Sequence, residues 1–325
     1  MQLTSKQQTK YLYTFTFYEE ERFLASLELR SLFPDGELLE GNIIQTYRKI
    51  NPSRSPFIKG RMEILLKRNS LPKMMMDLGE LQLEDNSYKI KYIKNPSLSK
   101  SEERHLEDRR QIEKQIGLSM YSKQGQVDLH HPDQIYGVIC LQNGIWLFGK
   151  YKESKAEWHS HQQKPNNYST ALNTRVARAV VNIAVPEPAG IKVIDPCCGI
   201  GTVLIEALSM GIKIKGSDVN PLVMSGVREN IAHFGFSAEV KLKDIRDVEG
   251  NYDVAIIDMP YNLCSVQDPV VQLEMLRSTR SFAKKMVVIT IDSIDDLILK
   301  AGFVIHDRCI VKKGKNFQRE ILVCY

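Results

Sequence analysis

The chain has 325 residues, with 44 lysines and arginines against 39 aspartates and glutamates, so its formal net charge is +5. Hydrophobic residues make up 43% and charged residues 26%, which is the balance of a globular protein able to bury a core. This length favours two or three domains. The mild basicity is compatible with a nucleic-acid partner but does not require one. No apolar run approaches the roughly eighteen residues of a membrane helix, so no membrane partner is expected.

The cysteines argue against two further classes of protein. They lack the paired spacing of a zinc site and of a secreted disulfide framework. The apolar run "YLYTFTF" near the start is also too short for a signal-peptide core. We therefore expect a cytoplasmic protein with reduced thiols and no metal requirement. The six cysteines are Cys140, Cys197, Cys198, Cys264, Cys309 and Cys324.

The first half of the chain mixes strand-like and helix-like patterns. "YLYTFTF" and "SYKIKYIK" (87–94) alternate as strands do, and Phe23, Leu24, Leu27 and Leu32 follow helical spacing. A charged segment over 100–117 predicts a solvated helix that ends at Gly117. "QVDLHHPDQIYGVICLQNGIWLFGKY" then predicts two strands around the Asn-Gly turn at 143–144. Residues 152–167 are polar and contain Pro165, which is typical of a linker.

The second half alternates short apolar strands with helices. The strand patterns are "IKVID", "IKIKGSD", "VKLKD", "YDVAIID" and "MVVIT", separated by helical patterns over 202–210, 221–233, 270–284 and 292–300. Gly211 is placed to end the first of these helices. Two final strand patterns, "FVIHDRCIVKK" and "FQREILVCY", predict an antiparallel hairpin. This rhythm predicts an α/β fold with a doubly wound, mainly parallel sheet.

A glycine loop and a series of aspartates mark the candidate site. In "DPCCGIGTVLIEA", Gly199 and Gly201 satisfy the first two positions of a dinucleotide fingerprint, but the third is Leu204. Asp218 ends the next strand 19 residues after Gly199, where an acidic residue accepts hydrogen bonds from a ribose. With Asp195, Asp244 and Asp258, four successive strands end in aspartate. Each aspartate alone could cap a helix, but together they favour a nucleoside-containing cofactor.

The motif "DMPY" suggests how an amine could be held beside that cofactor. Asp258 can accept one N–H and the Met259 carbonyl another, while Pro260 fixes the turn and Tyr261 stacks on a planar ring. This arrangement would orient the lone pair of an exocyclic amine toward an electrophile. Cys197 and Cys198 are interpreted as small loop residues, not as catalytic thiols.

These motifs resemble the class I S-adenosylmethionine-dependent methyltransferases, with "DPCCGIGTVLIEA", "GSDVN", "KDIRD" and "DMPYN" in the family's order. The resemblance is closest to guanosine-N2 tRNA methyltransferases that carry a THUMP RNA-binding domain. Residues 164–184 resemble their pre-core helix, and "VDLHHPD" resembles part of THUMP. The resemblance implies a Rossmann-like sheet, S-adenosylmethionine as cofactor and structured RNA, specifically tRNA, as partner. It also implies three domains: a small ferredoxin-like α/β domain over 1–55, a THUMP-like domain over 56–155 and a methyltransferase domain over 156–325.

The same resemblance implies the site residues. Those expected to hold the target base are Asp258, Met259, Pro260 and Tyr261. Those expected to bind the cofactor are Tyr168, Thr170, Asp195, Cys197, Gly199, Gly201, Thr202, Asp218, Val219, Asp244, Ile245 and Asp258. Met259 departs from the family, which has proline at that position.

Other interpretations stay open from the sequence. The amine could belong to rRNA, DNA or a protein glutamine, or the chain could be an inactive RNA-binding protein. The lysines and arginines of "KYIKNPSLSK" and "HLEDRRQIEK" fit either a solvated face or an RNA contact. Trp146 and Trp158 are expected to be core anchors.

Overall fold

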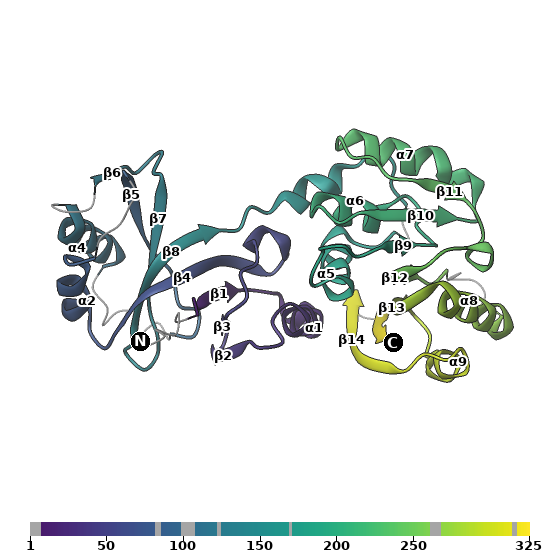
Figure 1. Ribbon diagram of the computed structural model, residues 1–325, viewed down its shortest axis with the longest axis horizontal. Helices are drawn as coiled ribbons and strands as arrows, with labels where there is room; N and C mark the ends of the chain where they lie inside the picture. The colour runs from purple at the N-terminus through teal and green to yellow at the C-terminus, as the bar shows by residue number, and fades with distance from the viewer. Residues whose placement is uncertain are drawn as a thin grey trace, which may run out of the picture. The chain divides into compact units, whose positions relative to one another are not determined.

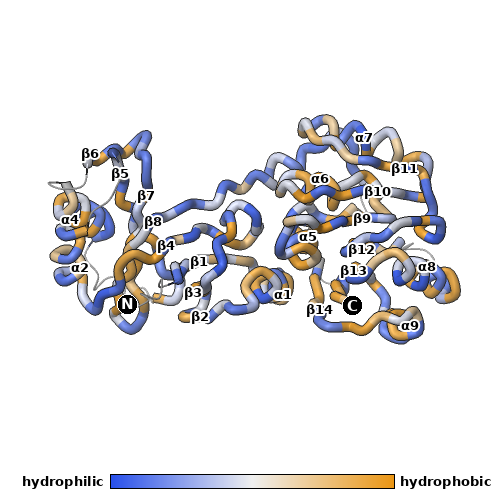
Figure 2. Tube along the Cα trace, viewed as in Figure 1, coloured by the Kyte–Doolittle hydropathy of each residue, from blue (hydrophilic) through white to orange (hydrophobic). Residues whose placement is uncertain are grey.

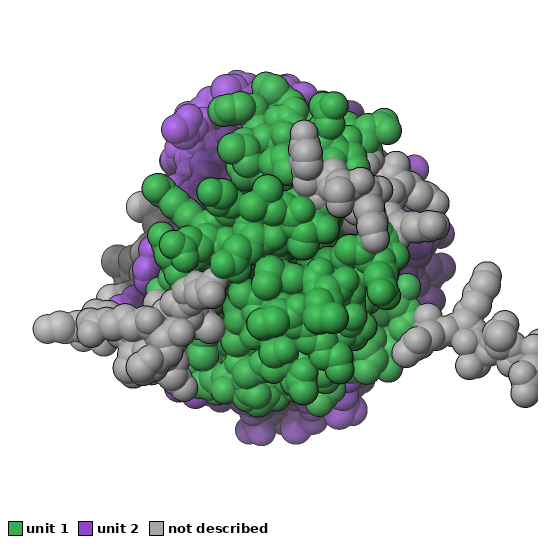
Figure 3. Space-filling view, turned by 90° about the vertical axis from the view of Figure 1, so that its left-hand side faces the viewer, with its two compact units in different colours: residues 1–16, 35–53, 57–155 green, residues 17–34, 54–56, 156–325 purple. Residues whose placement is uncertain are grey.

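The computed structural model describes residues 8–81, 86–98, 108–121, 125–168, 171–260, 268–313 and 317–325 (Figure 1). Its contacts divide the chain into two compact units, which Figure 3 colours separately. Unit 1 comprises residues 1–16, 35–53 and 57–155, and unit 2 comprises residues 17–34, 54–56 and 156–325. Among the described residues, no helix has the length and apolar character needed to cross a membrane.

Unit 1 is built on one sheet, which has eight strands in the described residues, in the order β2-β3-β1-β4-β8-β7-β5-β6. The long strand β4 pairs with β1 on one side and with β8 on the other, so a single sheet runs through both predicted N-terminal domains. The predicted division at residue 55 stays a prediction. The elements are β1 (Tyr11–Phe15), β2 (Glu37–Glu40), β3 (Ile43–Thr46), β4 (Ile58–Arg68), α2 (Leu71–Leu78), β5 (Ser87–Tyr92), α4 (Arg109–Tyr121), β6 (Gln126–Val127), β7 (Gln134–Cys140) and β8 (Trp146–Glu153).

Local sequence signals account for much of this unit. Gly144 has φ 75° in the predicted Asn-Gly turn between β7 and β8, and the ring of Trp146 is buried as expected. Helix α4 continues past Gly117, so the predicted helix end is wrong. The Gly117 carbonyl accepts a hydrogen bond from the hydroxyl of buried Tyr88 at 3.0 Å, and Met120 lies in the core one turn later. Tertiary packing therefore extends the helix.

Unit 2 contains the doubly wound sheet that the sequence predicts. The described strands run in the order β11-β10-β9-β12-β13-β15-β14; the first five are parallel, and β15 and β14 form the antiparallel C-terminal hairpin. Helices such as α5 and α8 carry both hydrophobic and hydrophilic residues (Figure 2), as helices with one buried face do. The strands are β9 (Val193–Asp195), β10 (Ile214–Asp218), β11 (Val240–Leu242), β12 (Tyr252–Asp258), β13 (Ala283–Thr290), β14 (Ile305–Lys313) and β15 (Phe317–Cys324).

The helices of unit 2 include one from the start of the chain. Helix α1 packs against α5 and β14, so the contacts group it with the C-terminal half. The α-helices are α1 (Arg22–Leu32), α5 (Thr174–Ala184), α6 (Thr202–Ser209), α7 (Met224–His233), α8 (Pro269–Phe282) and α9 (Asp295–Lys300). The short 3-10 helices in the described residues are η1 (Glu19–Glu21), η2 (Pro52–Arg54), η3 (Glu157–Gln163), η4 (Pro221–Val223) and η5 (Ile245–Asp247). The predicted linker over 152–167 is therefore partly helical, because Trp158 and His161 of η3 are buried.

A buried carboxylate joins α1 to α5. Glu28 is fully buried; its Oε2 accepts from Ser55 Oγ at 2.5 Å and its Oε1 from Asn182 Nδ2 at 2.6 Å. Arg54 Nε donates to Asn182 Oδ1 at 2.8 Å. Burial is the largest effect on this carboxyl and raises the pKa of Glu28 to about 7, although the hydrogen bonds and nearby arginines oppose the shift.

A buried ion pair joins α5 to α6. Arg178 Nη1 donates to Glu206 Oε2 at 2.6 Å, and the two side chains are 1% and 0% exposed. The other oxygen of Glu206 lies 2.6 Å from His161 Nδ1, and Arg178 Nε donates to the Arg54 carbonyl at 2.9 Å. Helix α6 is thereby fixed at its buried face.

Replacing Glu28 by Gln should make the stability of the protein less dependent on pH. Because folding raises the pKa of Glu28 from 4.5 to about 7, the stability it contributes is fully present below about pH 4.5 and is lost as the pH rises through 7. Glutamine does not ionise, so Glu28→Gln should gain up to about 3 kcal/mol relative to the natural chain between pH 5 and pH 8. Urea unfolding at both pH values measures this difference. The exposed Glu20→Gln is the control, and an equal change in both variants would contradict the expectation.

A candidate cofactor and substrate crevice

The predicted aspartates meet in one crevice at the carboxyl ends of the parallel strands of unit 2. Asp195, Asp218 and Asp258 are the last residues of β9, β10 and β12. Strand β11 ends at Leu242, so Asp244 does not end its strand, as the sequence suggested; it caps η5 instead. All four still line the same cavity, whose volume is about 560 Å³. Open α/β sheets bind ligands at this edge.

The glycine loop is held in place by backbone hydrogen bonds. The Gly199 N–H donates to Asp218 Oδ2 at 2.8 Å, and the Cys198 N–H donates to the Ser217 carbonyl at 2.9 Å. Gly199 and Gly201 have φ values of 49° and 82°, a region that favours glycine. The loop therefore connects β9 to α6 in a conformation that its glycines make possible.

The cysteines of the loop are not arranged as nucleophiles. Cys198 is buried, and a Cβ built at Gly216 of β10 would lie 3.3 Å from its sulfur. Burial is the main cause that raises the pKa of both the Cys197 and the Cys198 thiol, and the neighbouring aspartates add to it. Both therefore remain thiols, which agrees with their interpretation as loop residues.

The crevice concentrates negative charge. Asp195 is buried, and its Oδ1 accepts from the Cys197 N–H at 3.1 Å. Burial raises the pKa of Asp195 well above its ordinary value, and the charges of Asp218 and Asp258 raise it further. Carboxylates that repel one another in this way favour a ligand that brings positive charge.

Asp258 carries an acceptor oxygen that the rest of the described protein does not use. Its Oδ1 is buried without a hydrogen-bond partner among the described residues. Burial raises the pKa of Asp258 to about 6, and the charge of Arg319 opposes this shift. A buried acceptor of this kind is costly in the free protein and is a candidate ligand contact.

Met259 shows how the chain accommodates its departure from proline. Its N–H donates to the Ile289 carbonyl of β13 at 2.9 Å, and its side chain is 2% exposed in a core cluster with Ile257 and Met275. The peptide after Asp258 is therefore fixed by the sheet and by apolar packing as well as by Pro260.

The structure brings most of the predicted site residues together. Gly201 is the N-cap of α6 and does not line the cavity; a Cβ built there would face Val227. Thr170 and Tyr261 lie outside the described residues. The predicted residues that line the cavity are Tyr168, Asp195, Cys197, Gly199, Thr202, Asp218, Val219, Asp244, Ile245, Asp258, Met259 and Pro260. Their individual roles stay predictions.

Sequence reasoning missed several other residues of the wall, including Arg246, Val271 and Met275. Val271 and Met275 lie one turn apart on α8. Apolar residues have this spacing in any helix with one buried face. The spacing therefore could not predict that these two residues line a crevice. Arg246 lies two residues after Asp244, and this closeness in sequence was the feature from which its place in the crevice could have been predicted.

Replacing Gly201 by Ala should strain the loop in two ways. Alanine is disfavoured at φ 82°, and its Cβ would lie 2.8 Å from Val227 Cγ2. We expect a loss of about 2 to 4 kcal/mol in the free energy of unfolding, measured by urea denaturation. Gly211→Ala is the matched control, because Gly211 has φ 75° but no atom within 4 Å of a built Cβ. Equal losses in the two variants would show that the contact with Val227 does not matter.

Comparison with known proteins identifies the class of this domain. Residues 161–288 match the family model of the RMKL-like methyltransferase domain. The matched residues include those that line the crevice, so this part of the chain is similar to a methyltransferase domain. The fold class and the resemblance to this class are confirmed.

The curated relatives are enzymes that modify guanine in RNA. The chain is 30% identical over 164 residues to the tRNA (guanine(10)-N2)-dimethyltransferase of Methanothermobacter thermautotrophicus, covering 48% of each chain. It is 32% identical to the enzyme of the same name from Pyrococcus abyssi, over 38% of this chain and 37% of that one. It is 29% identical to the U6 snRNA (guanine-N(2))-methyltransferase THUMPD2 of Bos taurus, over 29% of this chain and 20% of that one.

The chain is thus related to guanine-N2 RNA methyltransferases. The matched regions span about half or less of the length of these curated relatives. The THUMP-like assignment of residues 56–155 stays a prediction.

Proposed function

We propose that this chain is an S-adenosylmethionine-dependent enzyme that methylates the exocyclic N2 amine of a guanosine in structured RNA, specifically in tRNA. The observation that carries the proposal is the crevice in which a glycine loop and four aspartates meet at the carboxyl ends of the strands. The methyltransferase-domain match and the guanine-N2 relatives support it.

The residues of the crevice fit this cofactor by charge and by hydrogen-bonding capacity. S-adenosylmethionine carries a sulfonium and an ammonium group, and four aspartates line the cavity. Asp218 accepts one backbone N–H on each carboxylate oxygen, from Gly199 and Asn220. A carboxylate has about four acceptor positions, so two remain for ribose hydroxyls. When bound, the cofactor supplies an electrophilic methyl group.

Asp258 is proposed to hold the target amine. Its Oδ1, which has no hydrogen-bond partner in the described part of the chain, can accept an N–H of the guanine amine and so direct the nitrogen lone pair away from the purine ring. Once the nitrogen becomes cationic, the same carboxylate stabilises it electrostatically. Because its pKa is about 6, Asp258 is mostly ionised at pH 7 to 8 and can act in this way.

Replacing Asp258 by Asn should lower the rate of methyl transfer by about a hundred-fold. The amide keeps one acceptor oxygen but lacks the negative charge. In the natural chain the rate should rise as the pH increases through about 6, the pKa of Asp258, because the ionised form is the active one. Asp258→Asn should lack this inflection. Single-turnover methylation of a tRNA transcript measures both effects.

The control variant is Asp253→Asn on the same strand. Asp253 lies at the opposite end of β12, where it accepts hydrogen bonds from Lys284 and from the Lys192 backbone. This variant should keep the natural rate and the natural pH profile. A natural rate in Asp258→Asn would mean that the amine is held by another group.

A groove in unit 1 supports contact with RNA. It has a volume of about 380 Å³ and lies between α4 and the strands β5 and β6. Leu118 and Leu129 are 62% and 61% exposed there, beside the cations of Lys89, Arg110 and Lys114. Cations attract phosphates, so we propose that RNA binds in this groove.

Reversing two of these charges should weaken RNA binding. Arg110→Glu combined with Lys114→Glu in the full chain should lower tRNA affinity at least about ten-fold and reduce the slope of its salt dependence by about two. Fluorescence anisotropy at several salt concentrations measures both. Lys59→Glu combined with Lys152→Glu makes the same charge change at exposed positions outside the groove. Equal losses in the two double variants would show only a general effect of charge.

The choice of RNA is tested directly by mass spectrometry of nucleosides. Total tRNA, rRNA and small nuclear RNA would be compared between cells with and without the gene. Loss of N2-methylated guanosine from tRNA alone is the expected result. Loss confined to another RNA would overturn the tRNA assignment, and no loss in any RNA would favour the inactive RNA-binding protein.

A further inference from the structure

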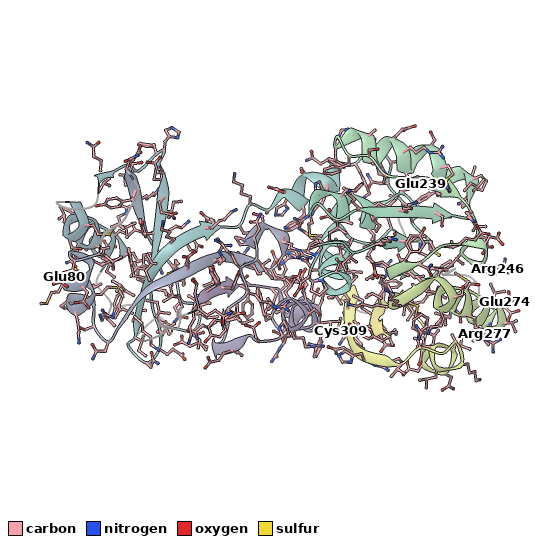
Figure 4. All side chains as sticks on the ribbon, in the orientation of Figure 1. Glu80, Glu239, Arg246, Glu274, Arg277 and Cys309 are labelled. Carbon is pink, nitrogen blue, oxygen red and sulfur yellow. The ribbon has the colours of Figure 1, made fainter. Side chains whose placement is uncertain are left out.

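Arg246 is a cationic residue inside an acidic crevice, and its guanidinium is held on two sides. Nε donates to Asp244 Oδ1 at 3.1 Å and Nη2 donates to Asp244 Oδ2 at 2.8 Å. Nη1 donates to Glu274 Oε2 at 3.0 Å. Figure 4 labels Arg246 and Glu274, which come from η5 and α8. The guanidinium of Arg246 therefore links Asp244 to helix α8.

These contacts leave the Asp244 carboxylate able to accept one more hydrogen bond. Its Oδ1 accepts from both the backbone N–H and the Nε of Arg246, and its Oδ2 accepts from Nη2. Three of the roughly four acceptor positions of a carboxylate are thus filled, and one remains on Oδ2. The hydrogen bonds and the charge of Arg246 hold the pKa of Asp244 below its ordinary value, so the carboxyl stays ionised and can only accept.

The ion pairs of Arg246 with Asp244 and Glu274 are too exposed to contribute much to the free energy of unfolding. The side chain of Arg246 is 46% exposed, and those of Asp244 and Glu274 are 23% and 50% exposed. Solvent screening makes pairs of this kind contribute little to the free energy of unfolding. The ion pairs act mainly on the orientation of Asp244. A planar guanidinium that is hydrogen-bonded to two carboxylates fixes the direction of the remaining lone pair of Asp244.

We propose that Arg246 is a positioning residue that makes Asp244 a single, fixed acceptor for the amino group of the cofactor's purine. This inference rests on the proposed function, since it assumes an adenosyl cofactor in the crevice. An adenine amine donates to the remaining position on Oδ2. A purine with an oxygen in place of that amine presents a second acceptor and is repelled. Arg246 thereby sets base specificity through Asp244, and Glu274 anchors it from α8.

Binding measured without turnover tests the proposal. Isothermal titration calorimetry of the full chain would compare S-adenosylhomocysteine with S-inosylhomocysteine, which has a 6-oxo group and a protonated N1 where the adenosyl compound has a 6-amino group and an acceptor N1. The natural chain should prefer the adenosyl compound by about ten- to a hundred-fold. In Arg246→Ala the carboxylate is no longer oriented, so affinity for the adenosyl compound should fall about ten-fold while that for the inosyl compound changes little.

Two further variants separate orientation from charge and from folding. Arg246→Lys keeps the charge but cannot bond both oxygens of Asp244 in the same way, so its preference should lie between those of Arg246→Ala and the natural chain. Arg277→Ala removes an equal charge from an exposed position of α8, three residues after Glu274 (Figure 4), and should leave the preference unchanged.

The outcomes distinguish this inference from the proposed function. An undiminished preference in Arg246→Ala, with tight adenosyl binding, would overturn the role of Arg246 and leave the proposed function intact. Failure of the natural chain to bind the adenosyl compound would overturn the proposed function and this inference with it.

Discussion

The ion pair between Arg178 and Glu206 fixes the part of unit 2 on which the crevice depends. Its two side chains are 1% and 0% exposed, so both charges have lost their hydration and must be satisfied inside the protein. Removing one partner of such a pair costs about 3 to 5 kcal/mol, because the other charge is left buried and unpaired. Glu206 lies on α6, and α6 begins immediately after the glycine loop. The pair therefore holds the helix that positions the loop.

The remaining contacts of this pair extend the same constraint. His161 of η3 contacts the second oxygen of Glu206, and the Arg54 carbonyl accepts from Arg178. Arg54 in turn donates to Asn182, which binds Glu28 of α1. A single polar chain thus runs from α1 through α5 to α6. Buried polar groups that are fully hydrogen-bonded specify one arrangement of the helices, and here they specify the arrangement behind the crevice.

The crevice differs from this polar chain, because its carboxylates retain hydrogen-bond acceptor positions that the described protein does not fill. The charge of Asp258 opposes ionisation of the buried Asp195, and Asp258 Oδ1 lacks a partner among the described residues. Asp218 and Asp244 retain acceptor positions that backbone or arginine donors do not fill. Helices α1, α5 and α6 are joined by buried hydrogen bonds and an ion pair, whereas the carboxylates of the crevice can still accept hydrogen bonds from a cationic ligand. This division suits a site that binds and orients two reactants.

Local sequence patterns were enough to predict the alternation of strands and helices in unit 2, the β7–β8 hairpin and the positions of Asp195, Asp218 and Asp258 at strand ends. These follow from local causes: side-chain periodicity, glycines that adopt positive φ, and the rule that parallel strands end at one edge. The place of α1 beside the C-terminal half depends on packing between distant segments, including the hydrogen bond that Asn182 donates to Glu28 across 154 residues. Packing also brings Arg246 to Glu274 and places α8 in the wall of the crevice. No local pattern encodes such contacts, because they arise only when surfaces distant in the chain are packed together and their buried polar groups must find partners.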